Sequence, residues 1–314
     1  MKRLAKSSAR GGSVPPVVRW SGGGYSRELR RLLGRPAVCP RAERTARRII
    51  AEIEKRGDAA LVELELRLDG CRLTPARLRV DTETLASAGR RLPPSFRRMA
   101  REAHRRILVC ARRELNRDWE MGTPYGGHIG ERFVPYDRVG VYVPGGVSPL
   151  ASTALMTVTL AKAAGVPQIV ACSPPCHSGD IHPAVLFCLR MAGATEVYRL
   201  GGIQAIAAMA LGTRSIRPVR KIVGPGGAYV TAAKKLLYGR VALDMIAGPS
   251  EIAVLADSTA AAPLVAADLL SQAEHGTGEE KALLVTDSPQ LARAVQRELQ
   301  RQVHQLPEAQ AAMR

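Results

Sequence analysis

Hydrophobic residues in the first third of the chain recur at the spacing of an α-helix. The pattern is helical from residue 41 to residue 119, and Gly57-Asp58 ends one helix and begins the next. The first predicted helix carries four apolar residues on one face: Ala46, Ile49, Ile50 and Ile53. Pro93-Pro94 begins a further helix, and we expect a short strand within residues 73–81. This region therefore predicts an N-terminal helical segment.

The pattern changes at Tyr136 to short apolar runs that alternate with helix-like segments. The predicted strands cover residues 139–143, 168–172, 196–200 and 221–223. The predicted helices cover residues 150–164, 182–192, 203–211 and 228–237. Strands that alternate with helices indicate a parallel sheet with right-handed crossovers. The sequence thus predicts an α/β fold in which helices cover a parallel sheet.

A second alternating block follows residue 250. It predicts strands at residues 251–256 and 282–287, and helices at residues 260–274 and 288–303. A parallel sheet of two strands would be poorly covered by itself. We therefore expect this block either to pair with the N-terminal region or to be cut short at Arg314.

Composition excludes several classes of protein. Apolar residues make up 46% of the 314 residues, which is typical of a globular chain. The net charge of +18 comes largely from arginine pairs beside acids on helix-like segments, without aromatic residues between them. We therefore expect solvated helix faces and no nucleic-acid partner. No apolar run is long enough to span a bilayer, so no membrane partner is expected.

Cysteine usage and the N-terminus indicate a cytoplasmic protein. The six cysteines lack the spacing of a disulfide framework, and Cys110, Cys172 and Cys188 lie in apolar runs that predict reduced core residues. The first 27 residues hold six Lys or Arg and no acidic residue. We interpret residues 1–40 as a poorly ordered leader.

Small residues gather at the predicted carboxyl ends of the strands, where open α/β sheets bind ligands. Tyr142 ends one strand, Gly201-Gly202 and Gly224-Pro225-Gly226-Gly227 follow two others, and Gln204 lies in the first turn of its helix. The Gln204 amide could bind a nucleotide while free N–H groups face a phosphate. None of these turns has the G-x-G-x-x-G spacing of the Rossmann fingerprint. Taken together, the turns favour a nucleotide site.

Two further clusters could bind a metal. Gln272 and His275 lie three residues apart after an apolar helix face, but spacing alone favours a hydrogen-bonded pair, because zinc needs about three protein ligands. The other cluster, Cys172, Cys176 and nearby histidines, has no second C-x-x-C, so we interpret it as structural. Ser250 lacks the flanking residues of a nucleophile elbow and could bind the polar end of a substrate.

Several collinear motifs together resemble the histidinol dehydrogenase family over residues 41–314. They are Arg56-Gly57-Asp58-Ala59-Ala60-Leu61, Val139-Gly140-Val141-Tyr142-Val143-Pro144-Gly145-Gly146, Leu200-Gly201-Gly202-Ile203-Gln204-Ala205, Ile222-Val223-Gly224-Pro225-Gly226, Asp244-Met245-Ile246-Ala247-Gly248-Pro249-Ser250-Glu251 and Ser271-Gln272-Ala273-Glu274-His275.

The resemblance implies a zinc-containing, NAD-dependent enzyme that oxidises L-histidinol through an aldehyde to L-histidine, the last step of histidine biosynthesis. It implies that Tyr142 and Gln204 contact NAD, that Gln272 and His275 bind Zn²⁺, and that Ser250 holds the amino alcohol beside them.

The family fold implied by the resemblance has two incomplete Rossmann-like domains in a homodimer. A first, discontinuous domain would comprise residues 41–137 and 250–314, and would be incomplete at its C-terminus. A second Rossmann-like domain would comprise residues 138–249. This division would explain why the block after Ser250 has so few strands.

Two departures from the family pattern bear on activity. The family has Gly-Pro-Gly-Asn where this chain has Gly224-Pro225-Gly226-Gly227, so an expected NAD contact is absent. The family's general-base Glu-His pair, and its remaining Asp and His zinc ligands, correspond to positions beyond Arg314. We therefore expect no catalytic base and little activity from these 314 residues. The alternatives are a related NAD-dependent dehydrogenase of another small polar alcohol, and a non-catalytic remnant.

Overall fold

The computed structural model describes residues 15–20, 22–34, 39–145, 149–176, 179–248, 250–273 and 281–304. The chain divides into two compact units. One unit is Val38–Ile246, and the other combines Met1–Ala37 with Ala247–Arg314. The predicted discontinuous domain of residues 41–137 and 250–314 stays a prediction.

A five-stranded parallel sheet forms the centre of the Val38–Ile246 unit. Its strands are β3 (Arg138–Tyr142), β4 (Gln168–Ser173), β5 (Glu196–Arg199), β6 (Lys221–Val223) and β7 (Ala242–Leu243). Their order is β5-β4-β3-β6-β7, and Val139 is aligned with both Ile169 and Lys221. The chain builds outward from β3 on one side and then returns to build from β6 on the other. The sheet therefore has a topological switch point between β3 and β6, where open α/β sheets bind ligands at the carboxyl ends of the strands.

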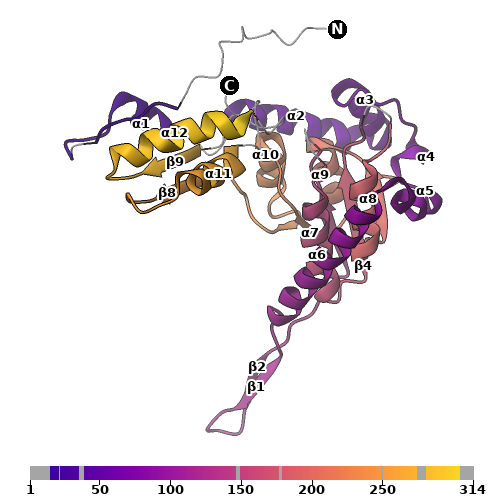
Figure 1. Cartoon of the computed structure of the whole chain (residues 1–314). Helices are drawn as coiled ribbons and strands as arrows, with labels where there is room; N and C mark the ends of the chain where they lie inside the picture. Colours follow the sequence, from indigo (N-terminus) through magenta and orange to yellow (C-terminus); the bar gives the residue numbers. More distant parts are fainter. Residues whose placement is uncertain are drawn as a thin grey trace. The chain divides into compact units, whose positions relative to one another are not determined.

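Helices cover both faces of this sheet, as the strand–helix alternation predicts. One face packs against α7 (Ala151–Ala163), α8 (Pro183–Ala192) and part of α6 (Pro94–Arg113). The other packs against α9 (Gly202–Leu211), α10 (Ala228–Leu237), α2 (Pro40–Arg56) and α3 (Asp58–Leu68). Side chains alternate between the faces, so Val141 joins the first core and Tyr142 the second. Helix α2 packs against both α9 and α10 on this face (Figure 1).

The structure differs from the sequence-based expectation at three places in this unit. Residues 73–81 form α4 (Pro75–Leu78) in place of a strand, because Pro75 starts a helical turn and only Arg79 forms an isolated bridge, to Tyr198. Short α5 (Thr82–Ser87) and a 3-10 helix (Ala88–Arg91) follow. The predicted helical region ends instead in an exposed antiparallel hairpin of β1 (Trp119–Gly122) and β2 (His128–Glu131), with Met121 opposite Ile129 (Figure 1). The third difference is Cys110, which is exposed on α6 because the core contacts only part of that helix; Cys172 and Cys188 are buried as expected.

The second unit is a smaller α/β arrangement. Parallel strands β8 (Glu251–Leu255) and β9 (Lys281–Val285) are aligned from Glu251 opposite Lys281, and α11 (Ala262–Ala273) and α12 (Pro289–Val303) pack together. Helix α1 (Arg27–Leu33) lies within the expected leader of residues 1–40. Among the described residues, no helix is both long and apolar enough to cross a membrane.

Candidate nucleotide site at the carboxyl edge of the sheet

The carboxyl edge of the five-stranded sheet carries the glycine turns that the sequence singles out. Gly201 is the N-cap of α9, and Gly227 is the N-cap of α10. Gly224 has φ +120°, and a Cβ there would collide with the carbonyl oxygen of Tyr142. The chain therefore needs glycine at this point for β6 to leave the sheet beside β3. Two helices thus begin at one edge, and their positive ends favour a phosphate there.

Tyr142 ends β3 and lies directly beneath the start of α9. Its side chain is buried, and its hydroxyl oxygen accepts a hydrogen bond from the Gly202 backbone N–H at 3.0 Å. Burial raises the pKa of the Tyr142 hydroxyl well above its usual range, so the group stays protonated. The hydroxyl therefore remains a donor at neutral pH while it holds the first turn of α9.

Gln204 lies in the same turn and has 1% of its surface exposed. Its Nε2 donates to Glu65 Oε1 at 3.0 Å and to Asp69 Oδ2 at 3.2 Å. Glu65 Oε1 also accepts from the Gly201 N–H at 3.2 Å. The structure thus brings Tyr142 and Gln204 together around Gly201 and Gly202, while their role as NAD contacts stays a prediction.

Sequence reasoning missed Glu65 and Asp69. Glu65 lies four residues after Leu61 on the apolar face of α3, and it is fully buried. That position was the available signal, because an ionisable residue within an apolar helix face must find a buried partner. Asp69 is the C-cap residue of the same helix, and its carboxyl, like that of Glu65, accepts a hydrogen bond from Gln204 on α9.

The environment of Glu65 favours its neutral form. Burial, followed by the nearby Asp69 carboxylate, raises the Glu65 pKa to about 8, although hydrogen bonds from Gln204 and Gly201 oppose part of this rise. Burial also raises the Asp69 pKa. At neutral pH the pair therefore carries less negative charge than two ionised carboxylates would.

An ion pair between buried Lys234 and partly exposed Asp244 fixes the second glycine turn. Lys234, 4% exposed on α10, donates from Nζ to the Gly224 carbonyl oxygen at 2.5 Å and to Asp244 Oδ1 at 2.7 Å. Asp244 Oδ2 accepts from the Gly224 N–H at 2.8 Å. Hydrogen bonds from Lys234, Gly224 and Met245 lower the Asp244 pKa against the opposing effect of burial. Both backbone groups of Gly224 are thus held, which fixes where the turn toward Gly227 begins.

The remaining predicted site residues belong to the second unit. Ser250 is exposed before β8, and its carbonyl oxygen accepts from the Lys281 N–H at 3.5 Å. Gln272 is half-buried in the last turn of α11. Because α11 runs back against the strands, its end returns to the edge where β8 and β9 begin. Ser250 and Gln272 therefore share the amino edge of this small sheet, whereas His275 lies outside the described residues.

No metal cluster stands out in the part of the chain that the structure describes. It contains no group of three or more His, Cys, Asp or Glu side chains that could hold an ion. Cys172 is buried, Cys176 is exposed, and His182 caps α8 by accepting from the Ala184 N–H at 3.2 Å. His177 lies outside the described residues, and the structural interpretation of that cluster stays a prediction.

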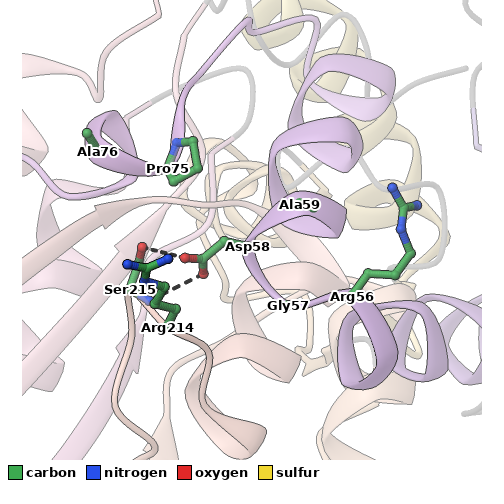
Figure 2. A pocket seen from close by; sticks show the side chains of 8 residues that line it. All are labelled: Arg56, Gly57, Asp58, Ala59, Pro75, Ala76, Arg214 and Ser215. Carbon is green, nitrogen blue, oxygen red and sulfur yellow. Dashed lines mark hydrogen bonds between the residues drawn. The ribbon is translucent and has the colours of Figure 1, made fainter.

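A cavity of about 510 Å³ lies at the start of α3 (Figure 2), and none of the residues of the carboxyl-edge turns line it. Its carboxylate, Asp58, already accepts hydrogen bonds from the Ser215 hydroxyl at 2.7 Å and the Ser215 N–H at 3.3 Å. Arg56 points away from both and pairs with Glu52 and Glu63. The polar groups here join α3 to the loop after α9, so we assign this cavity no ligand.

The fold and its polar edge define an α/β protein with a helix-covered parallel sheet and a candidate ligand site at the switch point. The sequence profile described as Histidinol dehydrogenase matches residues 37–314. The chain belongs to the histidinol dehydrogenase family, which confirms the resemblance seen in its motifs.

Individual relatives agree with this assignment. The chain is 44% identical to the histidinol dehydrogenase of Rhizobium meliloti (strain 1021) over 85% of its own length and 61% of the relative's. It is 43% identical to that of Moorella thermoacetica, over 94% and 67% of the two lengths. The crystal structure of histidinol dehydrogenase from Elizabethkingia anophelis matches with a TM-score of 0.82 at 35% identity, covering 91% of this chain and 66% of that one. The chain thus spans about three fifths to two thirds of the length of these relatives.

Proposed function

We propose that this chain is the nucleotide-binding portion of an NAD-dependent histidinol dehydrogenase, and that NAD binds at the carboxyl edge of the five-stranded sheet. The observation that carries the proposal is the Gln204 side chain at this edge. Its Oε1 is buried and has no hydrogen-bond partner among the described residues. A buried acceptor without a partner is costly, and a ligand donor would satisfy it.

The residues of this edge suit a dinucleotide in three ways. The starts of α9 and α10 provide backbone dipoles for a pyrophosphate, Tyr142 fixes the first of these turns, and Lys234 with Asp244 fixes the second. When bound, NAD supplies the acceptor for the hydride of an alcohol. The residues of this chain would bind and orient it, and we assign no proton-transfer step to the described side chains.

The proposal extends to an amino alcohol substrate and to zinc through Ser250, Gln272 and His275. The described residues do not make up a zinc site, because Gln272 alone contributes one oxygen and zinc needs about three protein ligands. We therefore derive no step through zinc. Binding of substrate by these residues, and assembly into a homodimer, rest on membership of the family.

Calorimetric titration of the purified chain with NAD tests the proposal. We expect binding by the unaltered chain and a loss of about tenfold or more in Gln204→Met, which removes the buried acceptor. Gln300→Met is the matched control, because Gln300 is exposed on α12. Absence of NAD binding, or equal affinity in the two variants, would refute the assignment of this edge. Because the sequence predicts little activity from these 314 residues, the substrate is tested by binding: histidinol and other small alcohols are titrated into the NAD-loaded chain, and tightest binding of histidinol supports the proposed substrate over its alternatives.

A further inference from the structure

The Gln204 amide has a fixed direction in this structure. Its Nε2 lies between two carboxyls of α3, 3.0 Å from Glu65 Oε1 and 3.2 Å from Asp69 Oδ2. Carboxylate oxygens accept hydrogen bonds, so the nitrogen must face them and the oxygen must face away. A Cβ at Gly202 would lie 3.3 Å from Gln204 Oε1, which places that oxygen against the first turn of α9.

We propose that Glu65 and Asp69 are positioning residues that hold Gln204 with its carbonyl oxygen toward the ligand, so that Gln204 selects a hydroxyl or amino donor of the nucleotide. This inference rests on the proposed NAD site. It adds that Gln204 recognises the ligand only by accepting a hydrogen bond through Oε1, because its Nε2 already donates to Glu65 on α3 and to Asp69 at the end of that helix.

Glu65 is suited to this role because its second oxygen is also buried. Glu65 Oε2, like Gln204 Oε1, has no hydrogen-bond partner within the described part of the chain. An ionised Glu65 would leave a buried charge at this oxygen, whereas a neutral carboxyl keeps Oε1 as an acceptor for Gly201 and Gln204. The neutral form therefore holds α9 and Gln204 without adding negative charge beside a pyrophosphate.

The charge at this point should depend on pH. The groups that face Glu65 are Asp69 and Cys71 after α3, Tyr142 on β3 and Cys172 on β4, together with the amide of Gln204. Burial raises the pKa of Tyr142 and Cys172, so both stay neutral. The pKa of Glu65 lies near 8, so a rise from neutral to alkaline pH adds one buried negative charge, and NAD affinity should fall.

NAD affinity measured by calorimetry between about pH 6.5 and about pH 9.5 tests this role. We expect the NAD affinity of the unaltered chain to fall about tenfold above about pH 8. Glu65→Gln should bind NAD as tightly as the unaltered chain at neutral pH and should keep that affinity at alkaline pH, because glutamine keeps the acceptor and cannot ionise. Glu65→Leu removes the acceptor and should weaken binding about fivefold at neutral pH. Glu63→Gln, an exposed position on the same helix, should behave like the unaltered chain.

Circular dichroism of each variant confirms that it is folded before its affinity is compared. Binding by Glu65→Leu equal to that of the unaltered chain, or the same loss at alkaline pH in Glu65→Gln, would overturn the positioning role while leaving the NAD site in place. Failure of the unaltered chain to bind NAD would overturn the proposed function and this inference together.

Discussion

Replacing Glu65 with glutamine should remove a pH-dependent cost to folding. In the folded chain the pKa of Glu65 is about 8, against an ordinary value of 4.5. Between these values the folded state holds a proton that the unfolded state has released. The free energy of unfolding therefore falls as pH rises from about 4.5 to about 8, and the loss is complete above that range.

The size of this effect follows from the shift. At about 1.4 kcal/mol per pKa unit, the shift corresponds to about 5 kcal/mol. Asp69 titrates alongside Glu65 and will respond to the substitution, so the measured difference should lie on the order of 3 to 5 kcal/mol. Glutamine does not ionise, so the gain in stability of Glu65→Gln over the unaltered chain should grow by this amount from acid to alkaline pH.

Urea denaturation followed by circular dichroism, at intervals from about pH 5 to about pH 9, measures this difference directly. Glu63→Gln is the control on the same helix, because Glu63 is exposed and pairs with Arg56. Its difference from the unaltered chain should stay nearly constant over this range. Parallel stability curves for Glu65→Gln and the unaltered chain would show that Glu65 ionises normally in the fold, and the reasoning about its buried environment would be wrong.

Four other substitutions test separate parts of the structure. Gly227→Asn restores the asparagine of the family pattern and should raise NAD affinity in calorimetry; weaker NAD binding would contradict this. It should also stabilise the chain by a few tenths of a kcal/mol, because a Cβ there meets nothing within 4 Å and asparagine is a good N-cap for α10. Asp244→Asn should cost about 2 to 3 kcal/mol in urea denaturation by leaving the Lys234 ammonium buried without its counter-charge, and an unchanged midpoint would contradict this. Gln272→Ala tests the zinc ligand that family membership implies: it should lower the zinc that the chain retains after incubation with zinc, measured by atomic emission, whereas equal zinc in both forms would remove this residue from the proposed ligands. Glu196→Gln should lower the free energy of unfolding more at neutral pH than near pH 2. Arg138 lowers the Glu196 pKa to about 2, so the stability that this pair contributes is lost as pH falls from 4.5 toward that value. An equal loss at both pH values in urea denaturation would exclude this pair as the source.

Periodicity was sufficient for most of the sheet and its helices. The strand at Lys221–Val223 and the helix at Ala228–Leu237 match the predicted bounds, because apolar runs between glycine turns leave few alternatives. The strand order could not be read from the sequence. It depends on β6 returning to pair with β3, a contact between residues about 80 positions apart that no local pattern specifies.

Local propensity misled where tertiary contacts or turns decided the outcome. Residues 73–81 look extended, yet Pro75 begins a helical turn and only one bridge to Tyr198 forms. The hairpin formed by Trp119–Gly122 and His128–Glu131 was missed because both its strands are exposed and show no alternation of burial.

The candidate site was only half visible from the sequence. Glycine turns at strand ends identified the region of Tyr142 and Gln204, and the motifs identified the family. The partners of Gln204 could not be found this way, because Glu65 is 139 residues distant in the sequence and its spacing is that of an ordinary helix position. A buried carboxyl acquires its role only when the fold places a donor beside it.

The proposed NAD site at the carboxyl edge is tested most directly by nuclear magnetic resonance of the isotopically labelled chain with added NAD. We predict that the Gln204 side-chain amide and the backbone amides of Gly201, Gly202 and Gly227 shift together and saturate at one NAD per chain. A cavity of about 870 Å³ at the opposite, amino edge, which includes Arg217, serves as the internal reference. Shifts confined to that edge, or no shift at Gln204 at saturating NAD, would contradict the account.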